Sequence, residues 1–225
     1  MALRENQLRI TGVCCGCSRG KYGMSSMPFV MNKILGLSAW FGLYDRWAER
    51  RLGQVHDTLI ELAAPSGNTE ILDIGCGTGI LSCRLAGIVD GSVVHGVDVS
   101  PCMIRIAQKR GKGHCPTAQY QVGTAVRLPY SDGQFDLVCS CLLFHLLGDS
   151  DKERALREVF RVLRPGGKYA CAEFEEYPVQ FWGGKLTRYP GDLIGVVGFD
   201  IHTKAAGPSI TRNRPVVYRV MVKPE

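Results

Sequence analysis

Three glycines in a short turn are the clearest chemical signal in this sequence. Gly75, Gly77 and Gly79 stand two residues apart and follow the apolar run Ile71–Ile74. Glycine lets the backbone turn sharply and approach a ligand where a side chain would collide. A helical pattern starts near Ile80, and the free N–H groups of a helix N-terminus attract polar ligands. We therefore expect this turn to bind a cofactor.

An acidic residue at the end of the next strand narrows the type of cofactor. Asp98 ends the apolar run 93–98, 19 positions after Gly79. Such a residue accepts hydrogen bonds from ribose hydroxyls, as it also does in dinucleotide sites. A dinucleotide fingerprint would need glycine at position 80, where Ile80 stands, and the lysine of a phosphate-binding loop is missing after Gly79. The pattern favours a nucleoside cofactor, with an NAD-linked enzyme as a remaining alternative.

The elements that position these residues alternate between strands and helices. An amphipathic helix is predicted over residues 45–63, because Leu52, Val55, Leu59 and Leu62 repeat at helical spacing. Ser100 and Pro101 predict the start of a helix through about Arg110, and a capping-box pattern of Ser150 and Glu153 predicts another that ends before Pro165 and Gly166. The predicted strands are residues 71–74, 93–98, 118–123, 135–144, 168–174, 197–203 and 216–222. Strand–helix alternation predicts a parallel sheet.

Four segments in order carry a resemblance to a known family. These are E-ILDIGCGTG, VDVSPCMIRIA, LPYSDGQFDLV and ALREVFRVLRPGG, within residues 40–175. Together they resemble the successive motifs of class I S-adenosylmethionine-dependent methyltransferases, in particular the group that includes ubiquinone and menaquinone biosynthesis C-methyltransferases and some phospholipid N-methyltransferases. The resemblance implies an α/β fold with a doubly wound, mostly parallel seven-stranded sheet, Rossmann-like, with an N-terminal helical extension.

The resemblance also implies roles for residues at matching motif positions. Gly75 and Gly77 would pass under the methionine part of S-adenosylmethionine, and Asp98 would take the ribose hydroxyls. Asp73 would contact the methionine amine or support the loop. Val99 and Met103 would flank the adenine, although Met103 also suits ordinary helix packing. The implied cofactor-binding residues are Asp73, Gly75, Cys76, Gly77, Asp98, Val99, Met103, Thr124, Ala125 and Ser140.

One position departs from the family pattern. The family often carries an acidic residue before the alanine that precedes Leu-Pro, where it bonds the adenine amino group, and this chain has Thr124 and Ala125. The Thr124 hydroxyl carries no charge, so the backbone of Thr124 and Ala125 is the other candidate for this contact.

His145 is the candidate catalytic residue. It follows the predicted strand 135–144, at the edge where open α/β sheets bind ligands, and histidine titrates near neutral pH. Methyl transfer from a sulfonium is a direct displacement, so the protein chiefly aligns the reacting atoms, and a general base is optional. A packed histidine bonded to the backbone is the alternative.

Composition and charge divide the chain into three parts. The length of 225 residues and the 45% hydrophobic content suit one α/β domain. We expect a disordered basic tail over 1–27, a helical cap over 28–66 and the cofactor-binding domain over 67–225. The apolar cap either packs against the sheet edge or forms a lid over the cofactor. The formal charge of +6 is concentrated at the two ends, which predicts solvated tails or peripheral contact with an anionic membrane.

Cysteine usage and apolar run lengths predict a cytoplasmic protein. Most cysteines lie in apolar strand or helix patterns, where free thiols behave as small hydrophobes: Cys76, Cys83, Cys102, Cys139, Cys141 and Cys171. The pair Cys14 and Cys17 lacks a second pair of ligands nearby, so no metal is expected. No apolar run is long enough to span a bilayer, and no RNA-binding signature is present.

The predicted function is methyl transfer from S-adenosylmethionine to a small-molecule or lipid-like acceptor. A phospholipid amine or a quinone-type ring is the specific alternative. A cofactor-binding but non-catalytic regulatory or scaffold subunit is the alternative of another class. The sequence does not reveal the oligomeric state.

Overall fold

The computed structural model describes residues 43–174, 191–211 and 214–225. Its strands are β1 Glu70–Ile74, β2 Val93–Asp98, β3 Ala118–Val122, β4 Phe135–Cys141, β5 Leu163–Phe174, β6 Asp200–Thr211 and β7 Arg214–Val222. Its helices are α2 Leu43–Ala63, α3 Ile80–Ile88, α4 Pro101–His114, the 3-10 turn η1 Phe144–Leu146, α5 Asp149–Val162 and α6 Gly191–Val197. Within these residues the strands form one sheet in the order β3-β2-β1-β4-β5-β7-β6.

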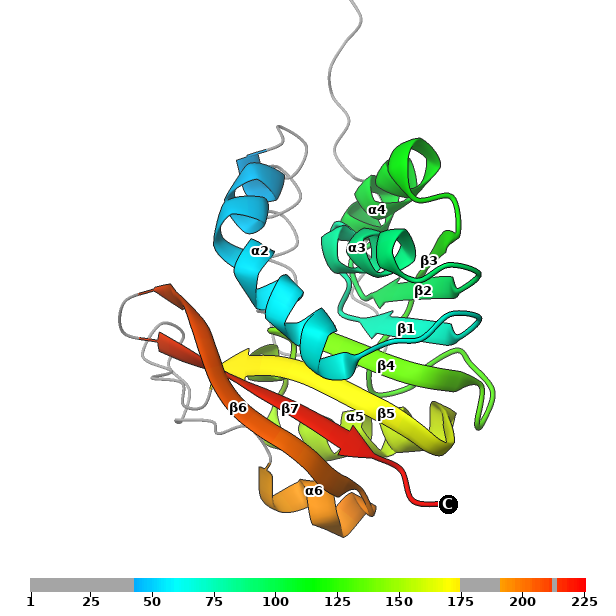
Figure 1. Cartoon of the computed structure of the whole chain (residues 1–225), viewed down its shortest axis with the longest axis vertical. Coiled ribbons are helices and arrows are strands. Elements are labelled where there is room, and N and C mark those ends of the chain that lie inside the picture. Colours follow the sequence, from blue (N-terminus) through cyan, green and yellow to red (C-terminus); the bar gives the residue numbers. More distant parts are fainter. Residues whose placement is uncertain (1–42, 175–190, 212–213) are drawn as a thin grey trace, which may run out of the picture.

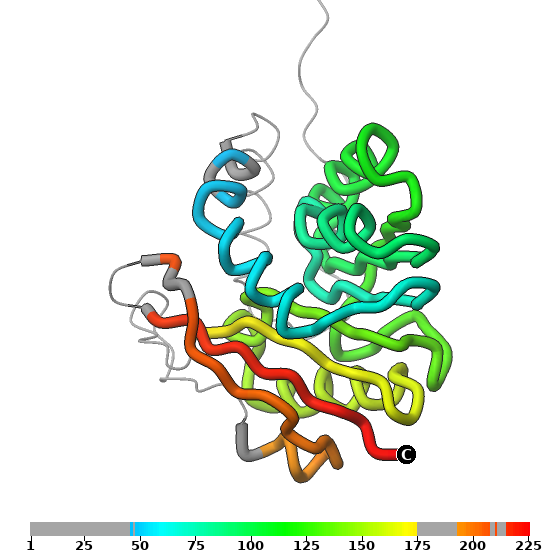
Figure 2. Tube along the Cα trace, viewed as in Figure 1, coloured from blue at the N-terminus to red at the C-terminus, as the bar shows by residue number. Residues whose placement is uncertain are grey.

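The sheet confirms the predicted doubly wound, mostly parallel α/β fold. Strands β1 to β5 pair in parallel, whereas β7 is antiparallel to both β5 and β6. The last strand of the chain therefore lies inside the sheet, between β5 and β6 (Figure 2). The predicted final pair of strands is confirmed, and both extend beyond the predicted ranges at one end. The predicted start of the first at residue 197 is wrong, because Val197 ends α6 and β6 begins at Asp200.

Helices cover both faces of the sheet (Figure 1). Side chains of β1 alternate between two hydrophobic clusters: Ile71 packs with residues of α2 and α3, whereas Leu72 and Ile74 pack with residues of α5 and α6. Helix α4 adds Ile104 and Ala107, which pack against β3. Because helices cover both faces of the sheet, the strands are nearly continuous apolar runs. None of the described helices is long and apolar enough to cross a membrane.

The helix starts show one confirmed and one wrong prediction. Helix α4 begins as predicted: Ser100 Oγ accepts the Met103 N–H at 3.3 Å, and Pro101 is the first residue. The predicted capping box of Ser150 and Glu153 is wrong. Helix α5 starts at Asp149 after Gly148, which has no side chain to cap it. Ser150 thus lies inside the first turn, where its hydroxyl cannot serve as the N-cap.

Two strand boundaries differ from the prediction for identifiable reasons. Strand β4 ends at Cys141 rather than at residue 144, because Leu142 has a left-handed backbone with φ 55°. Strand β5 begins at Leu163, although Pro165 and Gly166 follow. Residues 163–168 form an irregular segment opposite 135–137 of β4, and Gly166 N–H also bonds the Lys223 carbonyl at 2.9 Å. The proline–glycine pair therefore occupies a bulge in the sheet.

One cysteine departs from the free-thiol prediction. Cys83 in α3 forms a disulfide with Cys115, just after α4, with Cα atoms 5.4 Å apart. Since the partner lies 32 residues away, the apolar pattern of α3 does not reveal the pair. The other five predicted free thiols form no disulfide in the part of the chain that the structure describes: Cys76, Cys102, Cys139, Cys141 and Cys171. Cys83 therefore gives no support for a reducing compartment.

Several predictions lie outside the described residues. These are the basic tail 1–27, residues 28–42 of the cap and the cysteine pair Cys14 and Cys17. Residues 175–190, between β5 and α6, also lie outside.

Candidate cofactor site

The glycine turn follows β1 and is tied to the end of β2. Gly75, Gly77 and Gly79 all have positive φ, at 70°, 54° and 79°. The N–H groups of Gly75 and Cys76 both donate to the Val97 carbonyl, at 2.8 and 3.1 Å. This pairing fixes the turn at the carboxyl edge of the parallel strands, where open α/β sheets bind ligands.

The glycines differ in what a side chain would meet. A Cβ at Gly79 would lie 2.8 Å from the Tyr120 hydroxyl, so Gly79 is required by packing. A Cβ at Gly77 would meet no heavy atom within 4 Å. The space beside the Gly77 backbone is therefore open, so a ligand could approach the chain closely at this point.

Asp98 lies directly beside this open backbone. Its Oδ2 accepts the Gly77 N–H at 3.0 Å, and its Oδ1 accepts the Ser100 N–H at 2.8 Å. Burial raises the pKa of Asp98, and these two hydrogen bonds oppose the rise. Each oxygen accepts one of these N–H groups and can accept a further donor, since a carboxylate has about four acceptor positions. The geometry suits two adjacent hydroxyl donors of a ribose.

Asp73 supports the turn from inside the protein. The side chain is buried, and Oδ2 accepts the Ser82 hydroxyl of α3 at 2.6 Å. Burial raises the pKa of Asp73 to about 7, against the effect of the Ser82 bond. Asp73 therefore joins the end of β1 to α3, and its contact with a methionine amine stays a prediction.

The remaining predicted cofactor residues divide into two groups. Cys76 in the turn and Met103 in α4 are buried, whereas Val99, directly after β2, is 47% exposed. Thr124 and Ala125 follow β3; Thr124 Oγ1 accepts the Val126 N–H at 3.4 Å, and its carbonyl accepts the Arg127 N–H. The adenine contact predicted for Thr124 and Ala125 stays a prediction.

Ser140 lies apart from this group. Its side chain is fully buried within β4, and its hydroxyl bonds the Tyr169 hydroxyl at 2.8 Å. Tyr169 belongs to the hydrophobic cluster of the α5 face. The structure thus does not bring the Ser140 side chain together with Asp73 and the glycines.

His145 lies in η1, just beyond the carboxyl end of β4. Its Nδ1 is 3.6 Å from Oε2 of Glu173, a fully buried carboxylate on β5. The other oxygen of Glu173 accepts the N–H groups of Leu143 and Phe144, at 2.5 and 2.7 Å. Glu173 therefore holds the backbone before His145 and lies beside the imidazole. Sequence reasoning missed Glu173, although a glutamate inside the apolar run YACAEF is itself a signal, because charged residues are rarely buried without a partner.

A narrow cavity of about 60 Å³ lies between α2 and the glycine turn. Its lining is formed by Ala48, Leu52, His56, Asp73, Gly75, Cys76, Gly77, Thr78, Ile80, Leu81 and Cys141. The predicted helix before the first strand thus forms one wall of the candidate site. His56 was also missed, and its signal was a polar residue within the apolar stripe of that helix.

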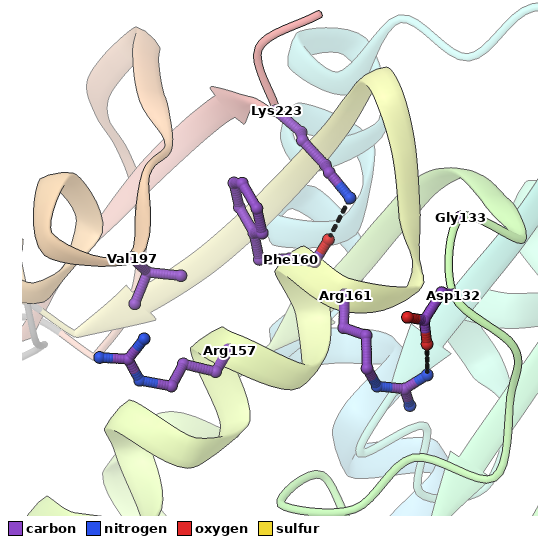
Figure 3. A pocket seen from close by; sticks show the side chains of 7 residues that line it. All are labelled: Asp132, Gly133, Arg157, Phe160, Arg161, Val197 and Lys223. Atoms are coloured by element: carbon purple, nitrogen blue, oxygen red, sulfur yellow. Dashed lines mark hydrogen bonds and ion pairs between the residues drawn. The ribbon is translucent and has the colours of Figure 1, made fainter.

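A larger hollow of about 590 Å³ lies elsewhere (Figure 3). Gly133 precedes β4 and Lys223 follows β7, so this hollow lies at the opposite edge of the sheet. Its cations already have partners: Arg161 pairs with Asp132 at 2.6 Å, and Lys223 donates to the Phe160 carbonyl at 2.9 Å. The glycine turn, not this hollow, is the candidate site.

One family of known proteins matches the part of the chain that contains the glycine turn. The profile of a family described as "Methyltransferase domain" matches residues 71–167, which begin in β1 and include the glycine turn and Asp98. The chain carries a class I S-adenosylmethionine-dependent methyltransferase domain. Demethylmenaquinone methyltransferase of Thermus thermophilus is 32% identical over 154 residues, 68% of this chain and 64% of that protein.

Other relatives extend this comparison. Ubiquinone/menaquinone biosynthesis C-methyltransferase UbiE of Rubrivivax gelatinosus is 33% identical over 145 residues, 64% of this chain and 50% of that protein. The chain therefore spans from half to just under two thirds of the length of these relatives. A methyltransferase from Methanosarcina mazei shares the fold with a TM-score of 0.59 at 23% identity, over 69% of this chain and 92% of that one. A methyltransferase from Aquifex aeolicus shares the fold with a TM-score of 0.62 at 17% identity, over 78% of this chain and 93% of that one.

The residues of the methyltransferase domain fit the cofactor of its family. The open Cβ position at Gly77 leaves room for a ligand, and the Asp98 carboxylate beside it accepts hydroxyl donors. Asp73 lines the cavity beside the turn, and its raised pKa means that a nearby cationic group would stabilise its charged form.

Replacing Gly77 with alanine tests this open backbone. The left-handed conformation at Gly77 costs a non-glycine residue about 1–2 kcal/mol, and the new methyl group would also occupy ligand space. We expect at least a threefold loss of S-adenosylmethionine affinity, measured by calorimetry. Gly87→Ala in α3 is the matched control, because its Cβ would meet nothing within 4 Å; we expect unchanged affinity. Unchanged affinity of a folded Gly77→Ala variant would contradict the assignment.

Proposed function

We propose that this protein transfers the methyl group of S-adenosylmethionine to a ring carbon of a quinol-type small molecule. The observation that carries the methyl-donor part is the open turn at Gly77 beside the Asp98 carboxylate. Support for the acceptor comes from the relatives, whose names specify demethylmenaquinone or ubiquinone and menaquinone biosynthesis. A phospholipid amine, the other acceptor expected from the sequence, lacks this support.

In this proposal the site residues bind the cofactor, orient the acceptor and accept its proton. When bound, S-adenosylmethionine supplies a methyl group activated by its sulfonium. Asp98 holds the ribose, and Asp73 and the turn hold the methionine part. His145 accepts the proton of the ring hydroxyl, which raises the electron density at the adjacent ring carbon. That carbon would bond the methyl group as the carbon–sulfur bond breaks, and its own hydrogen would then leave as a proton to solvent, which restores the aromatic ring. Glu173 positions the imidazole in this proposal: its carboxylate holds the backbone of η1 and lies 3.6 Å from Nδ1 of His145.

Calorimetric titration followed by an activity assay tests the proposal. We expect micromolar binding of S-adenosylmethionine and S-adenosylhomocysteine and no binding of NAD. We then expect methylation of a short-chain demethylmenaquinol, detected by a mass increase of one methylene, about 14 Da. Binding without turnover on this quinol and on phosphoethanolamine would instead favour the non-catalytic alternative.

Location and membrane contact belong to the same proposal. A lipid-soluble quinol would bring a cytoplasmic enzyme to the membrane surface, and the basic ends of the chain suit anionic lipids. Flotation with anionic and neutral vesicles tests this contact. We expect the protein to float with the anionic vesicles only.

A further inference from the structure

His56 is a buried polar residue on the wall of the candidate site. His56 lies on α2, where Ala48, Leu52 and His56 follow one another at intervals of four residues and so share one face of the helix. All three side chains line the cavity beside the glycine turn. The side chain is 4% exposed. Among the described residues, no hydrogen-bond partner reaches its Nδ1. A buried polar atom without a partner costs free energy, so such atoms in a binding cavity are typical ligand contacts.

The surroundings of His56 favour the neutral imidazole. Burial is the main cause and the charge of Arg84 acts in the same direction, against that of Asp57, and together they lower the pKa of His56 to about 4. A neutral imidazole offers one N–H donor and one acceptor nitrogen. His56 can therefore bond a zwitterionic group without adding a charge to the cavity.

The sheet order indicates which end of the cofactor meets His56. Asp98 ends β2, the glycine turn follows β1, and Cys141 ends β4; these strands are neighbours in the order β2-β1-β4. A ligand whose ribose lies at Asp98 must cross the turn after β1 to reach the cavity under α2. That cavity contains Asp73, Gly75, Cys141 and His56. The part of S-adenosylmethionine beyond the ribose and the sulfur is its amino-acid end.

We propose that His56 hydrogen-bonds the amino-acid end of bound S-adenosylmethionine. This inference rests on the proposed function. It assigns α2 a binding role in addition to its packing: the helix contributes a polar contact to the cavity that Asp73 also lines.

Two ligands that differ in the amino-acid end provide the test. S-adenosylhomocysteine has this end, whereas 5′-methylthioadenosine lacks it and keeps the adenosine and the sulfur. For His56→Leu we expect at least tenfold weaker binding of S-adenosylhomocysteine and binding of 5′-methylthioadenosine within twofold of wild type, both measured by calorimetry. His202→Leu, at an exposed position of β6, is the matched control and should change neither affinity.

A second variant keeps the test valid if His56→Leu does not fold. The amide of His56→Asn can reach the position of Nδ1, so we expect S-adenosylhomocysteine affinity within about threefold of wild type. Thermal melting without ligand establishes that each variant is folded. An equal loss for both ligands, or unchanged S-adenosylhomocysteine affinity in folded His56→Leu, would overturn the inference. Wild-type protein that binds neither ligand would overturn the proposed function instead.

Discussion

Replacing Glu173 with glutamine is expected to lower kcat by at least tenfold while S-adenosylmethionine affinity stays within twofold. Glutamine keeps an oxygen for the N–H groups of Leu143 and Phe144 but removes the charge that faces His145. General-base catalysis contributes about 10²- to 10⁴-fold, so the loss of its orienting charge should appear in kcat. Initial rates with short-chain demethylmenaquinol, with calorimetry for the cofactor, provide the measurement.

A double-mutant cycle separates positioning from general stability. If Glu173 acts through the imidazole, Glu173→Gln should have little further effect in a His145→Gln background. Equal losses in both backgrounds would show that Glu173 has a structural role alone. Glu153→Gln, which removes a carboxylate paired with Arg157 on the exposed surface of α5, is the matched control and should leave kcat unchanged.

The alanine variant of Glu173 should be much less stable. Alanine leaves the N–H groups of Leu143 and Phe144 without their acceptor, and each unsatisfied buried group costs about 1–3 kcal/mol. The expected loss of unfolding free energy is therefore about 2–6 kcal/mol, measured by urea denaturation. Glutamine, which keeps one acceptor oxygen, should lose less.

Replacing Asp98 with alanine is expected to weaken S-adenosylmethionine binding by at least tenfold. A hydrogen bond to a charged group contributes about 1.5–3 kcal/mol, equivalent to roughly 10- to 150-fold in affinity. The change also removes the acceptors of the Gly77 and Ser100 N–H groups, which hold the turn beside the start of α4. Calorimetry with S-adenosylmethionine and S-adenosylhomocysteine measures the loss.

Asp90, shortly before β2, provides the matched control for Asp98. Asp90→Ala removes an exposed carboxylate and should leave S-adenosylmethionine affinity unchanged. Asp98→Asn keeps one acceptor oxygen and should bind more tightly than Asp98→Ala. A folded Asp98→Ala variant with wild-type affinity would refute the ribose assignment.

The fold could be predicted largely because its signals are local. The apolar run of β1, the glycine turn and Asp98 stand close together in sequence, and Ser100 and Pro101 define the start of α4 by their own chemistry. Helical spacing likewise located α2. Such signals need no knowledge of distant partners, which is why the sheet and the cofactor turn were predicted together.

The missed residues depend on distant neighbours. Glu173 acquires its task from Leu143 and Phe144, about 30 positions earlier, and Cys83 from Cys115. His56 becomes a wall of the candidate site only once α2 packs over the turn after β1. Spacing within one element cannot reveal contacts of this kind.

The place of β7 between β5 and β6 has a consequence for how the chain assembles during synthesis. β6 leaves the ribosome before β7, yet β6 joins the sheet through its pairing with β7. Until β7 has left the ribosome, the apolar edge of β5 lacks its partner strand and β6 has no strand to pair with. An unpaired strand edge can associate with other chains. We therefore expect this half of the sheet to be completed only after β7 has been synthesised.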